Sequence, residues 1–348
     1  MTIRVGLAGY GLAGSVFHAP LIAATPGLSL VLVSTSNAER AAAARRDHPG
    51  IDVVPDTDAL LARAADFDLL VVGTPNATHH AVADAALDAG LHVVVDKPFT
   101  ATAAEGNALI AKARRARRVL TVFQNRRWDG DFLTVRHLIE AGELGDVYRF
   151  ESHFDRWRPE PRAGWKNEGD AAGAGLVYDI GPHLIDQALV LFGPAASVFA
   201  EQRTVRPSSH VVDDAYIILT HRSGISSHLA MSLVAAESGP RFRVLGRRGT
   251  FTKFGLDVQE DALRSGMRPG DARWGEEPRD SWGRLANGND VRTVPTERGA
   301  YERYYAGVAA AIGDGAPPPV DPADAVAAIA VIEAANVSAH EQRVVVLT

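Results

Sequence analysis

Short apolar runs alternate with longer alanine-rich stretches over the first third of the chain. The runs are rich in valine and have the length of buried parallel strands, at 3–8, 28–33, 68–72, 92–95 and 119–123. The stretches between them have helical length, at 13–24, 37–46, 77–89 and 102–115. This alternation predicts an α/β domain over residues 1–123, with the doubly wound parallel sheet of a Rossmann dinucleotide-binding fold.

The pattern changes after residue 123. Runs at 216–220 and 225–234 flank a glycine-containing turn, and runs at 241–245 and 250–254 flank another, which predicts two β-hairpins. Strands at 146–154 and 197–203 are expected in the same antiparallel sheet. Helices are expected at 176–192 and near 299–313 and 321–340, and 257–297 has the composition of a long surface excursion. Residues 124–348 are therefore predicted to form an α+β substrate-binding and oligomerisation domain.

Composition narrows the function classes. The chain has 348 residues, enough for about two domains, and no cysteine, which excludes disulfides, thiolate catalysis and cysteine-ligated metals. A net charge of −6 gives no basis for binding nucleic acid or an anionic membrane. No apolar run reaches the roughly 18–20 residues of a membrane span, and the strand at 3–8 leaves no room for a signal peptide. The expectation is a cytoplasmic enzyme with a small-molecule substrate.

The first turn between strand and helix carries a phosphate-binding motif. It reads Gly9-Tyr10-Gly11-Leu12-Ala13-Gly14, the GxGxxG pattern. Its glycines permit a tight turn, close approach of the backbone to a pyrophosphate and close packing of helix on strand. The motif predicts nucleotide binding rather than a purely structural turn.

The end of the second strand bears on the choice of cofactor. NAD-binding folds carry an acid there for the ribose hydroxyls, whereas this chain reads Ser34-Thr35-Ser36-Asn37-Ala38-Glu39-Arg40. The hydroxyls and the Arg40 guanidinium suit a 2′-phosphate, which favours NADP and leaves NAD possible. Ser36 can also cap the following helix, and both interpretations can hold at once.

Two further motifs carry candidate catalytic groups. Lys97, one of only four lysines, follows a predicted strand in Asp96-Lys97-Pro98, at the edge where such sheets bind ligands. A surface lysine paired with Asp96 is the alternative. Asp179 and His183 are four residues apart and would share one helical face, where a carboxylate supports a histidine as proton acceptor. A buried structural histidine is the alternative there, and no pattern of metal ligands such as HExxH occurs.

Taken in this order, these motifs resemble the Gfo/Idh/MocA oxidoreductase family. Its members carry E-K-P after the fifth strand and G-G-G-x-x-x-D-x-G-x-H on a helix, and here Asp96 replaces the glutamate and Ala174 the middle glycine. The runs 74–79 and 89–93 also match. The segments 11–21, 125–129 and 254–257 resemble the NADP-using scyllo-inositol dehydrogenase branch.

The resemblance implies hydride transfer between NAD(P) and a secondary hydroxyl of a polyol, inositol or sugar, at a site between the domains. Lys97 would orient the hydroxyl, and His183 would exchange its proton with Asp179 in support. The implied cofactor-binding residues are Gly9, Gly11, Leu12, Ala13, Gly14, Ser34, Thr35, Ser36, Arg40, Thr74, Pro75, Asn76, His79, Asp96, Lys97 and Asn125. The implied substrate-binding residues are Lys97, Asn125, Trp165, Lys166, Asp179 and His183.

The same resemblance implies an open-faced antiparallel sheet that joins copies into a homodimer or homotetramer. It also leaves two other functions open. Some relatives resemble NAD-dependent glycosidases that oxidise their substrate only transiently, and a few are nucleotide-sensing regulators that have lost catalysis. The presence of Lys97, Asp179 and His183 together argues against the regulator.

Overall fold

The structure is a computed structural model of the chain, and it describes residues 2–160, 173–207 and 209–347. The chain divides into two compact units. Unit 1 contains Met1–Asn125, Gln259–Trp274 and Ala300–Val326, and unit 2 contains Arg126–Val258, Gly275–Gly299 and Ala327–Thr348. A single division after residue 123 was predicted. Two later segments instead return to the first unit.

Unit 1 is built on a six-stranded sheet in the order β3-β2-β1-β4-β5-β6, in which all pairs are parallel. Its strands are β1 (Ile3–Ala8), β2 (Leu28–Ser34), β3 (Asp52–Val54), β4 (Leu69–Val72), β5 (His92–Val95) and β6 (Leu120–Val122). This confirms the predicted Rossmann sheet. Only β3 was not predicted, because three partly exposed residues leave no continuous apolar run to recognise.

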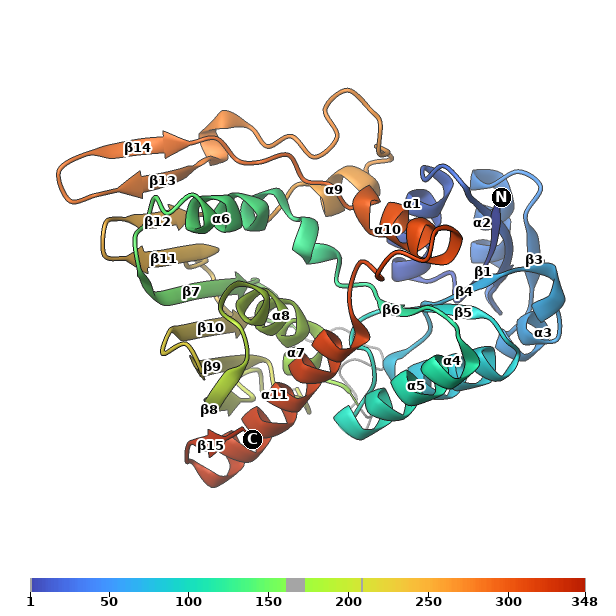
Figure 1. The fold of residues 1–348 in the computed structure, drawn as a ribbon, viewed down its shortest axis with the longest axis horizontal. Coiled ribbons are helices and arrows are strands. Elements are labelled where there is room, and N and C mark those ends of the chain that lie inside the picture. The colour runs from blue at the N-terminus through green and yellow to red at the C-terminus, as the bar shows by residue number, and fades with distance from the viewer. Residues whose placement is uncertain (1, 161–172, 208, 348) are drawn as a thin grey trace. The chain divides into compact units, whose positions relative to one another are not determined.

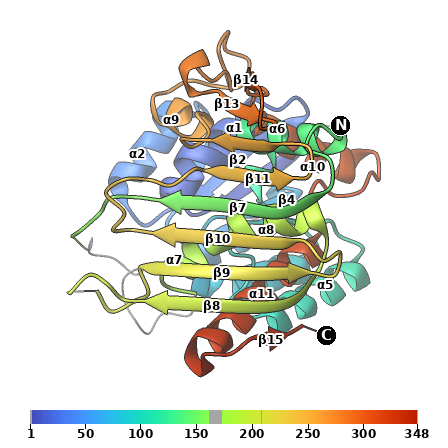
Figure 2. The ribbon, with the colours of Figure 1, turned by 90° about the vertical axis from the view of Figure 1, so that its left-hand side faces the viewer.

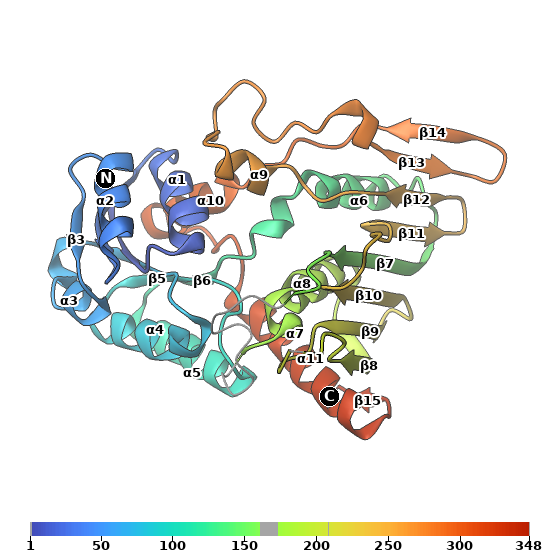
Figure 3. The same cartoon turned by 180° about the vertical axis from the view of Figure 1, so that it is seen from behind.

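Helices cover both faces of this sheet (Figures 1 and 3). α4 (His79–Asp88) and α5 (Ala103–Ala116) lie side by side on one face. The other helices are α1 (Ala19–Ala23), α2 (Ala38–Asp47), α3 (Thr57–Leu61), α9 (Gln259–Arg264) and α10 (Glu302–Gly313). The helix predicted at 13–24 is divided into a π-helix, η1 (Ala13–His18), and α1. Pro20 near the start of α1 has no N–H to donate, so a regular α-helix cannot run through it.

Aromatic packing explains why residues 300–326 belong to unit 1. Tyr304 of α10 meets the ring of Phe123 edge-on, with a centroid distance of 4.9 Å, and Tyr305 lies 6.0 Å from the same ring. Tyr301 contacts Phe17 of η1. All three tyrosines have no exposed surface. A late segment of the chain thereby completes the core of the first unit.

Unit 2 is built on a nine-stranded sheet in the order β14-β13-β12-β11-β7-β10-β9-β8-β15. Its strands are β7 (Val147–Asp155), β8 (Ala195–Arg203), β9 (Asp214–His221), β10 (Ser226–Ser232), β11 (Phe242–Gly246), β12 (Thr250–Lys253), β13 (Gly283–Ala286), β14 (Val291–Val294) and β15 (Val345–Val346). Both hairpins are confirmed. The sheet is mixed rather than antiparallel throughout, since β7 and β10 are parallel. The segment 257–297 is not only an excursion, because it adds β13 and β14 to the sheet.

Helices of unit 2 pack on one face of this sheet, and Figure 2 shows the other face, which no helix of the described residues covers. The helices are α6 (Gly130–Glu140), α7 (Leu176–Asp179), α8 (Gly181–Phe192) and the part of α11 (Pro322–Glu341) from Ala327 onward. α11 is long and apolar enough to cross a membrane, which differs from the expectation that no segment would. However, half of its most apolar stretch is buried inside the protein.

Candidate active site

The phosphate loop follows β1, and its glycines differ in how much space surrounds them. Gly9 has a φ of +92°, and a Cβ there would lie 2.7 Å from the Gly73 carbonyl oxygen. A Cβ on Gly14 would lie 2.2 Å from the carbonyl oxygen of Gly9. A Cβ on Gly11 would come near only the Arg40 guanidinium, at 3.8 Å. The first and third glycines are thus required by the protein's own packing, and the middle one leaves open space at the loop.

The end of β2 is hydrogen-bonded to the phosphate loop. Ser34 is buried, and its backbone carbonyl and Oγ both accept from the N–H of Gly9, at 3.1 and 3.3 Å. Thr35 Oγ1 accepts from the N–H of Asn37 at 3.3 Å. Asn37, not Ser36, caps α2, because its side chain accepts from the N–H of Arg40 at 2.9 Å. Arg40 is therefore in the first turn of α2, as predicted, and its guanidinium is exposed beside Gly11.

The loops after β4 and β5 are joined by a buried histidine. The ring nitrogens of His79 lie 2.9 Å from the carbonyl oxygen of Thr74 and 2.8 Å from that of Pro98. Burial lowers the pKa of His79, although the nearby charge of Asp96 opposes this. Pro75 is the N-terminal neighbour of a short 3-10 helix, η3 (Asn76–Thr78), that leads into α4. His79 thus contacts both loops, and a neutral ring donates to one of the two carbonyl oxygens.

Lys97 lies directly after β5, in the turn that ends with the cis Lys97–Pro98 peptide. Its backbone N–H donates to Asp96 Oδ1 at 2.8 Å, and the N–H of Asp96 donates to Val72 of β4 at 2.9 Å. Burial acts to raise the pKa of Asp96, but His18 and the charge of Lys97 outweigh it, so the pKa lies below its ordinary value. Asn125 is buried and is the last residue of the first segment of unit 1.

In unit 2, Asp179 and His183 lie on two consecutive helices rather than on one. α7 ends at Asp179, and α8 starts at Gly181 with Pro182 in its first turn. Proline is tolerated there because the first N–H groups of a helix have no intrahelical acceptor. The helix predicted over 176–192 is therefore divided between Asp179 and Gly181. His183 is buried and Asp179 is partly exposed.

The next turn of α8 is held by contacts that the sequence analysis did not find. Asp186 accepts two hydrogen bonds from Arg127, at 2.6 and 2.8 Å. Gln187 donates to the Arg126 carbonyl at 2.9 Å and accepts from Arg241 at 2.8 Å. The only available signal in the sequence was that Asp186 and Gln187, like His183, are polar residues in a helix that is otherwise apolar. Trp165 and Lys166, predicted to contact substrate, lie outside the described residues.

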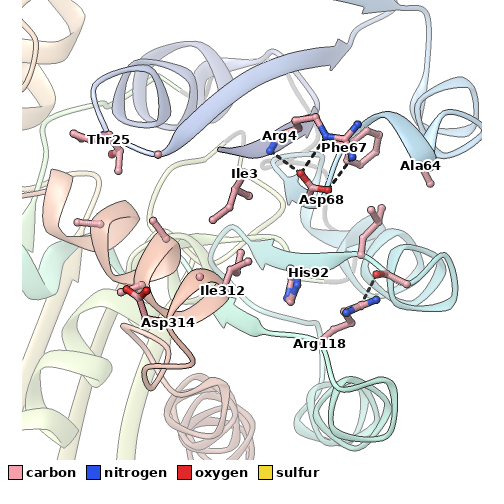
Figure 4. Close-up of a pocket in the computed structure, with 18 of the residues that line it drawn as sticks. Ile3, Arg4, Thr25, Ala64, Phe67, Asp68, His92, Arg118, Ile312 and Asp314 are labelled. Carbon is pink, nitrogen blue, oxygen red and sulfur yellow. Dashed lines mark hydrogen bonds and ion pairs between the residues drawn. The ribbon is translucent and has the colours of Figure 1, made fainter. Parts of the chain in front are cut away.

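Two further features of the described residues bear on the site. Within the described ranges, no group of three or more His, Asp or Glu side chains could hold a metal ion. A cavity of about 900 Å³ lies in unit 1 at the amino ends of β1, β4 and β5, lined by Ile3, Asp68, His92 and residues 306–314 among others (Figure 4). Gly9, Thr74 and Lys97 follow the carboxyl ends of the same strands. This cavity is therefore not part of the predicted nucleotide site.

Comparison with known proteins decides the family. Residues 3–124 match the family described as "Oxidoreductase family, NAD-binding Rossmann fold", and residues 136–347 match "Oxidoreductase family, C-terminal alpha/beta domain". The chain belongs to the Gfo/Idh/MocA oxidoreductase family. It is thus an NAD(P)-dependent oxidoreductase, and its phosphate loop lies in the cofactor domain of the family.

Relatives cover nearly the whole chain. The uncharacterized oxidoreductase YdgJ of Escherichia coli (strain K12) is 43% identical over 334 residues, which are 95% of this chain and 94% of that protein. The scyllo-inositol 2-dehydrogenase (NADP(+)) IolW of Bacillus subtilis (strain 168) is 38% identical over 350 residues, with 99% and 96% covered. The solved structure of the putative oxidoreductase yvaA from Bacillus subtilis has a TM-score of 0.94 at 37% identity, with 100% and 99% covered.

Proposed function

We propose that this Gfo/Idh/MocA protein is an NADP-preferring dehydrogenase that acts on a secondary hydroxyl of a polyol, inositol or sugar. The observation that carries the proposal is the place of Lys97, directly after β5, with its backbone N–H held by the Asp96 carboxylate. The similarity to a relative named as an NADP-dependent scyllo-inositol dehydrogenase supports the substrate class and the cofactor.

The residues present fit NADP. Gly11 leaves space for a pyrophosphate, and the exposed Arg40 guanidinium beside it provides a cation for a 2′-phosphate. The acid of that segment, Glu39, lies in the first turn of α2 and is exposed. When bound, the nicotinamide supplies the hydride acceptor or donor, and the protein supplies orientation and proton transfer.

The chain's own residues have separate tasks in this reaction. When an alcohol is oxidised, its carbon loses a hydride and its oxygen loses a proton, so the protein must take up that proton. We assign the proton to the His183 imidazole, with the Asp179 carboxylate in support. The Lys97 ammonium would stabilise the negative charge that develops on the oxygen. In this assignment, proton transfer and charge stabilisation both come from side chains.

The test is a panel of inositols, acyclic polyols, aldoses and ketoses, assayed in both directions by the absorbance of NADPH and of NADH. We expect turnover of at least one polyol or sugar, with kcat/KM in the oxidation direction rising with pH as the proton acceptor loses its proton. His183→Ala should abolish that limb of the profile. Tightly held NAD with no net turnover would indicate a glycosidase-type reaction instead. Cofactor binding with no turnover of any substrate would indicate a regulator.

A further inference from the structure

Three residues from distant parts of the chain meet in unit 1 at the end of β5. His18 is the last residue of η1, Asp96 directly precedes Lys97, and Tyr305 belongs to α10. Nδ1 of His18 lies 2.7 Å from the hydroxyl oxygen of Tyr305. Nε2 of His18 lies 3.9 Å from Oδ2 of Asp96, an electrostatic contact that is longer than a hydrogen bond.

This group is enclosed. Neither His18 nor Tyr305 has exposed surface, and the side chain of Asp96 is 16% exposed. The ring of Phe123 lies over the imidazole at a centroid distance of 4.5 Å. Buried polar groups that lose their partners are costly, so the orientation of His18 depends on the two groups that face its nitrogens.

The direction of the hydrogen bonds follows from the acceptors. A single ring proton on His18 would lie on Nε2, toward Asp96, because an ionised carboxylate can only accept a hydrogen bond. Nδ1 is then an acceptor, and the Tyr305 hydroxyl donates to it. Burial raises the pKa of Tyr305 well above its ordinary value, and Tyr304 and Asp96 add to this, so the phenol keeps its proton. The Tyr305 hydroxyl thus orients the His18 ring by a hydrogen bond, and Nε2 of His18 faces Asp96 at the longer distance of an electrostatic contact.

Asp96 connects this group of residues to Lys97. Besides His18, the charged or titratable groups that act on Asp96 are Lys97 itself and His79 of α4. While Oδ2 of Asp96 faces His18, Oδ1 accepts the backbone N–H of Lys97 at 2.8 Å. The orientation of one carboxylate therefore links the buried histidine to the backbone of the lysine.

We propose that His18 and Tyr305 are positioning residues for Lys97, which they act on by holding the Asp96 carboxylate in the orientation that receives the Lys97 N–H. This inference rests on the proposed dehydrogenase function. Neither residue is assigned a contact with substrate or cofactor.

Two neighbouring tyrosines of α10 provide a matched test. Tyr305→Phe and Tyr304→Phe each remove one hydroxyl from a fully buried ring, but the Tyr304 hydroxyl faces Thr121, at 3.5 Å, and not His18. We expect Tyr305→Phe to lower kcat about tenfold, with KM for NADP unchanged within about twofold, since it leaves a buried acceptor unpaired near the reacting group. Tyr304→Phe should leave kcat within about twofold of the wild type. Thermal unfolding of both variants measures the structural cost separately.

A second readout needs no turnover. Long-range ¹H–¹⁵N spectra of the histidine rings, with His18 assigned from its absence in His18→Gln, should place the proton on Nε2 in the wild type. Tyr305→Phe should shift the Nδ1 resonance of His18, and Tyr304→Phe should not. If Tyr305→Phe does not fold, His18→Gln replaces it, with the same expected loss of kcat at unchanged KM for NADP.

The outcomes separate the two proposals. An inactive wild type whose His18 spectra respond as expected would remove the dehydrogenase assignment and leave the hydrogen-bond network. An active wild type with equal kcat in Tyr305→Phe and Tyr304→Phe would overturn the positioning role and leave the dehydrogenase assignment. A His18 proton on Nδ1 would also overturn the positioning role.

Discussion

At the amino end of the six-stranded sheet, Arg4 and Asp68 form an ion pair at 2.8 Å, with 45% and 27% of their side chains exposed. At the carboxyl end of the same sheet, Asp96 lies between Lys97 and a histidine with no exposed surface. Both aspartates have a pKa below the ordinary value. For Asp68 the main cause is the hydrogen bond from Arg4, whereas Asp96 is ionised against the effect of its own burial.

This comparison helps to distinguish the functional end of the sheet from the opposite end. The amino end holds a cavity of about 900 Å³, and Arg4 and Asp68 in its wall form an ion pair with each other (Figure 4). The carboxyl end combines titratable groups whose pKa values are shifted by burial, such as His79 and Tyr305, with glycines that admit no side chain. Shifted pKa values occur at the amino end too, where burial lowers the pKa of His92, so the glycines of the phosphate loop and the buried groups around Asp96 are what distinguish the carboxyl end.

The largest expected effect is at Lys97. Lys97→Met should lower kcat about 10²–10⁴-fold, the range for a positioned proton-transfer or charge-stabilising group, with the Tm and NADPH affinity near those of the wild type. Lys112→Met is the matched control, because Lys112 pairs with Asp84 and Asp88 on the surface helices of the same unit. Steady-state kinetics with an active substrate measures both. A Lys97 variant within about tenfold of the wild type would remove this residue from the mechanism.

Arg40 is expected to have the next largest effect, on the choice of cofactor. A guanidinium that binds a phosphate contributes about 1.5–3 kcal/mol, or roughly 10- to 150-fold in affinity. The wild type should favour NADP over NAD by at least about tenfold in kcat/KM, and Arg40→Ala should reduce that preference chiefly through KM for NADP. Arg45→Ala, in the last turn of the same helix, is the control. Equal or better use of NAD by the wild type would contradict the assignment and leave the catalytic one intact.

Much of the carboxyl end could be predicted from the sequence because topology places it. In a parallel sheet, the carboxyl ends of all strands lie at the same edge. The apolar runs mark where each strand ends, so Gly9 and Lys97 could be placed at that edge without any knowledge of contacts. Glycine spacing and the family motifs identified the loop and the helix that carries His183. These signals are local in the sequence, and in the structure the loop follows β1 and His183 lies on a helix.

Contacts between distant residues could not be predicted in this way. His18 and Tyr305 are separated by 287 residues and Arg127 and Asp186 by 59, and neither pair has a local pattern. The break between α7 and α8 depends on a proline whose effect differs between a helix start and a helix interior. The strand β3 has too few apolar residues to stand out from a loop, and β15 is only two residues long.

A smaller effect is expected from the space around the loop glycines. A Cβ on Gly14 would lie 2.2 Å from a backbone oxygen that cannot move aside cheaply, so Gly14→Ala should destabilise the fold by about 1–3 kcal/mol. Gly11→Ala is the control, because its Cβ would make only an ordinary contact with a flexible side chain. Thermal unfolding without cofactor should show a lower Tm for Gly14→Ala alone. An equal Tm in the two variants would mean that the close approach at Gly14 does not constrain the loop.

The smallest effect is expected at the amino end. Because hydrogen bonding to Arg4 holds the pKa of Asp68 below its unfolded value, this group stabilises the fold at any pH above that unfolded value. The stabilisation is lost as the pH falls through the folded pKa. Asp68→Asn should therefore lower the Tm at pH 7 by no more than about 3 °C, since the pair is exposed, and the two Tm curves should converge in acid. Its kcat and KM should stay within about twofold of the wild type, because the pair is at the opposite end of the strands from Lys97. A loss of activity comparable to that of Lys97→Met would show that the two ends of the sheet are coupled, and the cavity beside Asp68 would then have to be counted as part of the functional machinery.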